Sequence, residues 1–180
     1  IINDINRAYS GEKLEPEGYT SYDLALDNRD ALAGDIYKNA ENYYKSVFEH
    51  AGGSISFYPE KNGAAPTAEL YHRETRSISV QNVKEFCKKH GITENVFFIS
   101  AFGITLGKYN FKKDAVFTTI YHGRNDSRLS ETVGMLVKTL PVFCDFSGTA
   151  KDCLSGVQKQ LIDSMNNDIY PFSQISHEFN

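Results

Sequence analysis

The stretch from Glu94 to Tyr109 constrains the fold most strongly, because apolar side chains lie almost all the way round its helical projection. A helix without a polar face has to be covered on several sides, so this segment is predicted to lie inside a packed core. Small residues at Ala101, Gly103 and Gly107 would let neighbouring backbones come close. The next segment, Asp114 to Tyr121, mixes β-branched and aromatic residues as an interior strand does.

The rest of the chain alternates between helical and strand patterns. Capping Ser or Thr residues with helical apolar spacing predict helices, and alternating or β-branched runs predict strands. The expected helices cover 1–9, two segments of 20–50 divided at Gly34, 79–89 and 149–166, and the further strands cover 54–58, 69–75 and 137–146. Pro141 should confine the last strand to an edge or a bulge. The predicted fold class is therefore α/β, a layered mixed β-sheet packed with helices.

Composition and charge exclude several functions. The net charge of -4 comes from 19 basic and 23 acidic residues scattered along the chain, so we expect no nucleic-acid partner. The longest apolar stretch, Val96 to Leu106, is shorter than the roughly 20 residues that cross a bilayer, so no membrane span is expected. The three cysteines, Cys87, Cys144 and Cys153, form no CxxC pair. They predict reduced thiols in a cytoplasmic protein rather than a zinc site or a disulfide framework.

Four segments follow one another in the order of a known set of motifs. Tyr121 to Arg124 reads YHGR and Val133 to Pro141 reads VGMLVKTLP; they resemble V-x-G-R and I-G-x-F-V-N-T-L-P of nonribosomal peptide synthetase condensation domains. Tyr19 to Leu26, YTSYDLAL, is similar to the family's Y-x-D-Y-A-x-W, and Asn167 to Phe172, NDIYPF, is similar to H-x-D-x-P-F. The resemblance implies the fold of the chloramphenicol acetyltransferase-like superfamily, and specifically its C-terminal subdomain.

The N-terminal segment Asn3 to Gly11 resembles the helix that follows the family's catalytic H-H-x-x-x-D-G motif. That motif is therefore expected just upstream of Ile1, since none of the five histidines here has a histidine neighbour. We expect 1–180 to be a partial condensation domain, with 1–50 as the helical segment after the motif and 51–180 as the C-terminal subdomain, truncated at its end. Alone, the chain is expected to be inactive and to self-associate through the apolar surface of its exposed tunnel face.

By this resemblance, the parent domain forms an amide bond between carrier-bound aminoacyl or peptidyl thioesters. The amine of the acceptor would attack the thioester carbonyl of the donor. Each substrate would arrive on the 4′-phosphopantetheine arm of a donor or acceptor peptidyl carrier protein, and no cofactor or metal would bind the chain directly. The rest of the synthetase, including the N-terminal condensation subdomain, is a further expected partner. A tunnel between the two halves would align the reacting groups and exclude water.

Arg124 is the residue with the sharpest physical argument for a role. It ends an apolar strand after Gly123, where a guanidinium would be partly buried and would need an anion. In related domains this Arg pairs with the Asp of the catalytic motif and supports the catalytic loop. Because that Asp is absent here, Asp126 or solvent is the expected substitute, and an ordinary surface arginine is the alternative.

The resemblance also implies a floor for the substrate tunnel, formed by Gly134, Leu136, Lys138 and Thr139. Leu136 and Lys138 replace the family's usual Phe and Asn. Lys138 carries hydrogen-bond donors only, whereas Asn also accepts, so the floor is expected to treat the acceptor substrate differently. The alternative is that Lys138 points to solvent.

His122 could serve as a base, but a lone histidine beside an aromatic residue at a strand end is more often structural. Other functions stay open besides amide formation. An epimerisation or cyclisation domain would share the fold. A degenerate module would bind carrier proteins without making a bond, and a coenzyme A-dependent acyltransferase would have a related fold and also use histidine.

Overall fold

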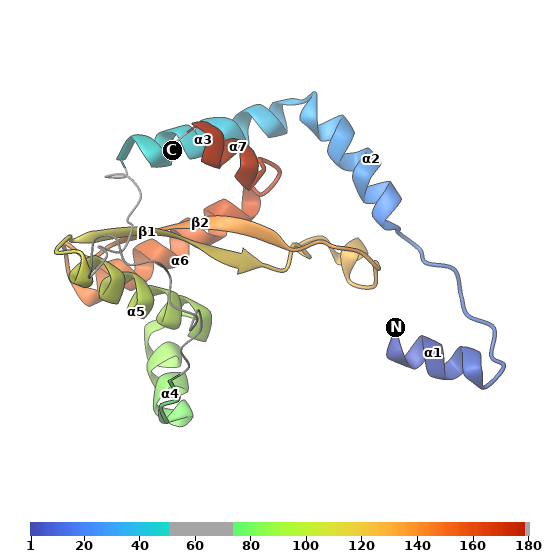
Figure 1. Cartoon of the computed structure of the whole chain (residues 1–180), viewed down its shortest axis with the longest axis horizontal. Coiled ribbons are helices and arrows are strands. Elements are labelled where there is room, and N and C mark those ends of the chain that lie inside the picture. The colour runs from blue at the N-terminus through green and yellow to red at the C-terminus, as the bar shows by residue number, and fades with distance from the viewer. Residues whose placement is uncertain (51–73, 179–180) are drawn as a thin grey trace, which may run out of the picture.

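The computed structural model describes residues 1–50 and 74–178 (Figure 1). Its elements are α1 (Ile2–Tyr9), α2 (Ser21–Leu32), α3 (Asp35–His50), α4 (Val80–His90), α5 (Glu94–Tyr109), β1 (Asp114–Tyr121), a 3-10 turn (Ser127–Leu129), β2 (Lys138–Asp145), α6 (Ala150–Asn166) and α7 (Phe172–Glu178). The predicted helices and the strands at 114–121 and 137–146 are confirmed, with small shifts at their ends. α7 has no counterpart among the predicted elements. The strand expected at 54–58 and residues 69–73 of the next lie outside the described residues.

Capping explains where several helices begin. Thr20 and Thr149 each accept a hydrogen bond from the backbone N–H three residues on, at Asp23 and Asp152, whose carboxylates accept in return from the cap. Thr93 caps α5 by accepting from the Val96 N–H. These hydrogen bonds satisfy N–H groups that a helix cannot pair internally, so the sequence predicts these starts well.

β1 and β2 pair antiparallel, in a register that runs from Asp114 opposite Asp145 to Tyr121 opposite Lys138. Among the described residues β2 has no second partner strand, in agreement with the edge position that Pro141 predicts. A side chain of α6 occupies the free backbone groups of this edge. Gln160 Nε2 donates to the Pro141 carbonyl at 3.0 Å, and Gln160 Oε1 accepts from the Phe143 N–H at 3.4 Å.

Helices cover both faces of the strand pair (Figure 1). On one face α5 and α6 enclose the main core, which consists of Val96, Ile99, Leu106, Ala115, Val142, Cys144, Cys153, Val157 and Leu161. On the other face the Phe143 ring meets Phe48 of α3, with ring centroids 5.0 Å apart. Tyr44 of α3 and Ile175 of α7 belong to a second buried cluster. The predicted α/β layering is confirmed, and the two described strands are antiparallel.

The expectation that α5 is a buried helix is wrong for one side of the helix. Gly103 and Gly107 face the sheet closely, and a Cβ atom at Gly103 would lie 2.6 Å from Cys144 Sγ. In contrast, Phe98 and Phe102 remain 47% and 51% exposed. The described elements that contact α5 are the two strands, α4 and α6, and they leave this side open.

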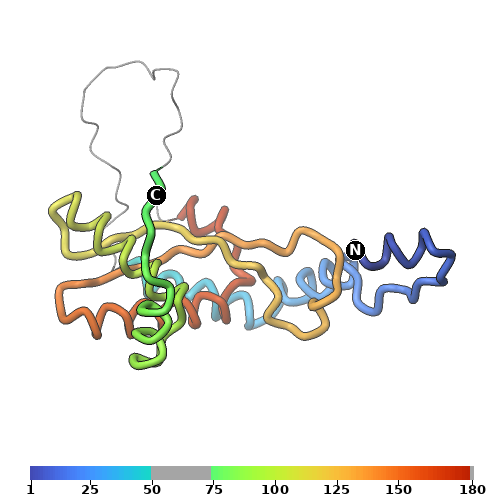
Figure 2. Tube along the Cα trace, turned by 90° about the horizontal axis from the view of Figure 1, so that it is seen from below, coloured from blue at the N-terminus to red at the C-terminus, as the bar shows by residue number. Residues whose placement is uncertain are grey.

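α1 extends away from the rest of the molecule at one end (Figures 1 and 2). Gly11, with a φ of +79°, ends α1 as predicted. None of the residues of α1 is buried. The chain then reaches α2, whose C-terminal end meets α3 at an angle (Figure 1). No helix in the described parts of the chain is long and apolar enough to cross a membrane.

Candidate functional site

The connection between β1 and β2 borders a cavity of about 500 Å³ at the end of the strand pair where β1 stops and β2 starts. Its walls come from α2, from the 123–138 connection, and from the C-terminal end of α6 with the residues after it. The apolar part of the lining consists of Leu24, Ala31, Leu129, Met135, Leu136, Val137 and Met165. All four motif segments, YTSYDLAL, YHGR, VGMLVKTLP and NDIYPF, therefore contribute to one cavity.

Gly123 brings the two ends of this connection into backbone contact. Its φ is +70°, and a Cβ atom there would lie 1.9 Å from the Leu136 carbonyl oxygen. A side chain at this position would therefore meet both backbone strain and a direct collision. The glycine of the YHGR motif thus lets the VGMLVKTLP segment lie against the end of β1, with Leu136 buried.

Arg124 is half-buried, and its side chain binds residues further along the same β1–β2 connection. Its Nη1 donates to the carbonyl oxygens of Leu129 and Thr132, the latter at 3.0 Å. The expectation that Asp126 would pair with Arg124 is wrong, because the Asp126 carboxylate binds Arg128 at 2.6 Å instead. The Nη1 group of Arg124 thus links two backbone carbonyls of the connection, and Arg124 has no acidic partner among the described residues.

His122 is exposed and lies beside the cavity rather than in its lining. Its Nδ1 accepts a hydrogen bond from the Arg124 backbone N–H at 2.9 Å, and its ring packs against Tyr121 with centroids 4.7 Å apart. Both contacts fit the structural interpretation of this histidine. A catalytic role for His122 stays a prediction.

The structure separates the four predicted floor residues. Leu136 and Lys138 line the cavity. Thr139 lies one residue further into β2, opposite Ile120. Gly134 lies against α2, since a Cβ atom there would be 3.1 Å from the Cβ of Ser21. Two of the four residues therefore meet at the cavity, and their role as a tunnel floor stays a prediction.

Lys138 does not point to free solvent. Its Nζ lies 2.9 Å from Asp168 Oδ1 and donates to the Asp168 carbonyl oxygen at 3.1 Å. The two side chains are 33% and 21% exposed. Asp168 belongs to the NDIYPF segment, so this ion pair joins two of the motif segments at the cavity.

The sequence analysis did not single out Arg128, which holds the chain before α2 against the β1–β2 connection. It contacts Asp126 and, at 3.2 Å, Asp27, and its guanidinium lies 4.5 Å from the centroid of the Tyr19 ring. Hydrogen bonds from Arg128 lower the pKa of Asp126. The Tyr19 hydroxyl donates to Asp27 at 2.6 Å. Residues about 100 positions apart in the chain meet here, and no local sequence pattern could indicate that.

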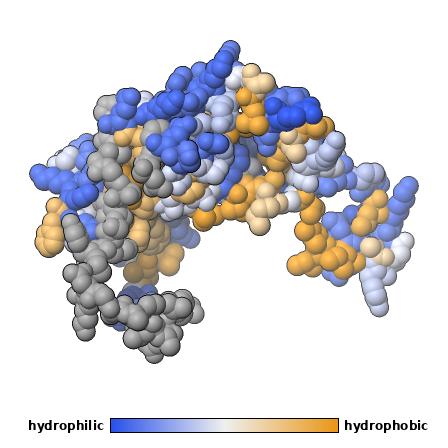
Figure 3. All heavy atoms as spheres, turned by 45° about the horizontal axis from the view of Figure 1, so that its top comes forward, coloured by the Kyte–Doolittle hydropathy of each residue, from blue (hydrophilic) through white to orange (hydrophobic). Residues whose placement is uncertain are grey.

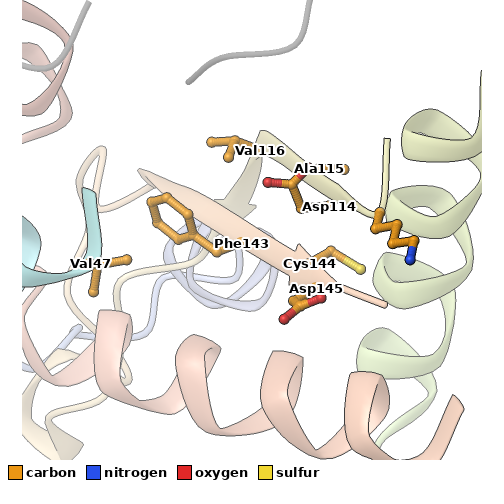
Figure 4. A pocket seen from close by; sticks show the side chains of 8 residues that line it. Val47, Asp114, Ala115, Val116, Phe143, Cys144 and Asp145 are labelled. Atoms are coloured by element: carbon orange, nitrogen blue, oxygen red, sulfur yellow. The ribbon is translucent and has the colours of Figure 1, made fainter. Parts of the chain in front are cut away.

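A second cavity, of about 470 Å³, lies at the opposite end of the strand pair. Figure 4 shows Val47 and Phe143 at one side of it and Asp114, Cys144 and Asp145 at the other. Burial raises the pKa of the Cys144 thiol, so the reactive thiolate is suppressed. None of the predicted site residues lies in this cavity, and we take the first cavity as the candidate site.

The candidate cavity is suited to holding and orienting a substrate. Its described lining contains charged, amide and aliphatic side chains together with Tyr19, but no histidine, cysteine or serine. Among residues 1–50 and 74–178, no three His, Cys, Asp or Glu side chains are placed to hold a metal ion. In the described lining, the groups available to contact a substrate are therefore charged, hydrogen-bonding and apolar side chains.

Comparison with known sequences gives the class of protein. The profile of the family described as "Condensation domain" matches residues 1–180. The chain belongs to the condensation domain family. It is 28% identical over 179 residues to nonribosomal peptide synthetase sidC of Arthroderma benhamiae and 26% identical over 193 residues to surfactin synthase subunit 1 of Bacillus subtilis. The alignments cover 97% and 100% of this chain but 3% and 5% of those proteins.

Solved structures agree on the fold. The first condensation domain of the calcium-dependent antibiotic synthetase aligns with a TM-score of 0.73 at 14% identity, over 97% of this chain and 40% of that one. The X-domain from teicoplanin biosynthesis aligns with a TM-score of 0.67 at 15% identity, over 94% of this chain and 40% of that one. The chain thus spans well under half of the structures that it matches. The predicted family and fold are confirmed.

Proposed function

We propose that this chain forms part of a condensation domain that joins carrier-bound aminoacyl or peptidyl thioesters through an amide bond. The catalytic histidine motif would come from sequence upstream of Ile1, and residues 1–180 alone would be inactive. The observation that carries the proposal is the cavity at the β1–β2 connection, where Gly123, Leu136 and Lys138 of two family motifs lie together. The family match supports the reaction class.

In this proposal the chain contributes substrate alignment. Donor and acceptor carrier proteins would present their phosphopantetheine arms to the cavity, and its walls would hold the acceptor amine near the donor carbonyl. Such alignment removes much of the entropic cost of a reaction between two bound partners. Arg124 would keep the connection in shape beside the missing catalytic loop. The free, buried cysteines support a reducing, cytoplasmic setting.

The test is amide formation by the complete protein that carries this chain. We would incubate it with one carrier protein loaded with a donor aminoacyl group and a second loaded with an acceptor. The proposal predicts a dipeptidyl thioester on the acceptor carrier, and no product when either carrier is omitted. Turnover of free acyl-coenzyme A without a carrier protein, at a rate equal to that with loaded carriers, would instead support the coenzyme A-dependent acyltransferase.

A non-catalytic carrier-binding module is the second candidate. The Lys138–Asp168 ion pair favours it, because it places two charges at the cavity where the family motif has a neutral Asn. The same assay separates the two candidates. A module that only docks carriers would bind both loaded carrier proteins, measured by isothermal titration calorimetry, and yield no amide.

A further inference from the structure

The Lys138–Asp168 pair is a link between two separate walls of the candidate cavity. Lys138 is the first residue of β2, directly opposite Tyr121 at the end of β1. Asp168 lies in the short connection between α6 and α7. Both residues line the cavity. Lys138 Nζ makes two contacts with Asp168: it lies 2.9 Å from the side-chain carboxylate and 3.1 Å from the backbone carbonyl oxygen.

Each side of this link is anchored in the interior. Two residues after Asp168, Tyr170 is 3% exposed and its ring lies 5.9 Å from that of Tyr44 on α3. Two residues after Lys138, Leu140 is 2% exposed. The ion pair therefore joins two rigid parts rather than two mobile surface side chains. Such a pair loses less side-chain entropy on forming than an exposed one does.

The other charges around the cavity cannot replace Lys138. Arg128 is engaged with Asp27 and Asp126. Among the described residues, Lys138 is the cation that lies within ion-pair distance of the Asp168 carboxylate. Removing the lysine charge would leave the partly buried Asp168 carboxylate, 21% exposed, without its cation, which is unfavourable. Without this contact the connection after α6 would be free to move outward, where water solvates Asp168 more fully.

We propose that Lys138 and Asp168 act together as a positioning pair that sets the width of the candidate cavity between β2 and the α6–α7 connection. The inference deepens the proposed function and rests on it for its effect on turnover. Neither residue is assigned a part in bond formation. Lys138 is not a solvent-facing replacement for the family's Asn, because it forms an ion pair with Asp168 of another motif segment.

This pairing makes a prediction that runs against the family motif. Lys138→Asn restores the family's residue, yet it leaves Asp168 unpaired, so it should lower kcat of amide formation by roughly tenfold, as expected when one partner of a poorly solvated ion pair is removed. The double variant Lys138→Asn with Asp168→Asn carries no stranded charge and should regain most of the lost rate. Lys138→Arg keeps a cation and should stay close to the wild-type rate.

The experiment measures kcat and KM for the loaded acceptor carrier in the complete protein, for the wild type and these three variants. Thermal unfolding curves establish that each variant is folded at the assay temperature. Lys159→Asn is the matched control, because Lys159 forms a similar ion pair with Asp163 at 3.1 Å on an exposed part of α6. The control should leave kcat and KM unchanged, whereas loss of positioning lowers kcat with little change in KM.

Hydrogen–deuterium exchange gives a readout that does not depend on turnover. Lys138→Asn should speed amide exchange both at the start of β2 and between α6 and α7, and the double variant should restore protection. If the wild type forms no amide, the proposed function fails, and the exchange result alone decides on the positioning pair. Unchanged exchange in Lys138→Asn, or a folded Lys138→Asn protein with wild-type kcat, would overturn the inference.

Discussion

Gly123 controls the shape of the candidate cavity through its backbone. With a φ of +70° and the Leu136 carbonyl 1.9 Å from the position of a Cβ atom, it has no room for a side chain. We expect Gly123→Ala to lower the free energy of unfolding by about 3 kcal/mol, from left-handed strain and displacement of the 136 backbone. Gly11→Ala is the control, since Gly11 has a φ of +79° and no atom within 4 Å.

Chemical denaturation of both variants separates the two causes. Gly11→Ala retains the strain but not the collision, so its effect should stay at or below about 1–2 kcal/mol. Equal effects of the two substitutions would show that the contact with Leu136 does not matter.

Two buried tyrosines offer a second comparison at the residue scale. The Tyr121 hydroxyl is buried with no hydrogen-bond partner among the described residues, whereas the Tyr44 hydroxyl donates to the Ser164 carbonyl at 3.4 Å. Tyr121→Phe should therefore raise the free energy of unfolding by about 1 kcal/mol, and Tyr44→Phe should lower it by about the same amount. Denaturant titration checks both signs, and a loss of stability in Tyr121→Phe would point to a partner for that hydroxyl.

At the scale of elements, Gln160 attaches α6 to the free edge of β2. Its amide donates to the Pro141 carbonyl and to Ser164 Oγ at 2.7 Å. Gln160→Leu leaves that buried carbonyl without a partner and should cost about 1–3 kcal/mol of stability. Gln158→Leu is a matched control on the same helix, because Gln158 Oε1 is buried and has no hydrogen-bond partner in the part of the chain that the structure describes. Thermal unfolding should find the control neutral or stabilised; equal losses would contradict the role of Gln160.

The elements were largely predictable because their signals are local. Thr93 and Thr149 mark helix starts, Gly91 and Gly11 mark ends, and β-branched residues mark β1. The partial exposure of α5 could not be predicted in the same way. Whether Phe98 is covered depends on which distant elements reach that side of the helix, and no local pattern contains this information.

The candidate site was predictable in part for the same reason. Motif spacing placed Gly123, Leu136 and Lys138 in two neighbouring segments, and the cavity brings them together. The partners of the charged residues were not predictable. Arg124 binds carbonyl oxygens of its own connection, and Lys138 binds Asp168, a residue 30 positions further along the chain.

At the scale of the whole molecule, α1 presents an uncovered apolar face. Ile1, Ile2, Ile5 and Tyr9 are 72%, 77%, 62% and 94% exposed. Figure 3 shows apolar side chains gathered at this end of the molecule. We expect residues 1–180 to self-associate at high concentration, and the Ile2→Glu, Ile5→Glu double variant to associate less. Sedimentation equilibrium measures both, and a wild-type monomer at all concentrations would contradict the expectation.

The central claim is that amide formation takes place at the cavity beside the β1–β2 connection. Met135 lines this cavity and is 89% exposed, so it lies at the opening, where Met135→Trp can obstruct entry without disturbing the core. Val133→Trp is the control, because Val133 lines a neighbouring hollow instead.

The decisive measurement is the intact mass of the acceptor carrier protein after reaction with the complete protein and a loaded donor. The wild type and Val133→Trp should increase this mass by that of the donor acyl group, and Met135→Trp should not. Transfer by folded Met135→Trp at the wild-type rate, or no transfer by the wild type, would contradict the claim.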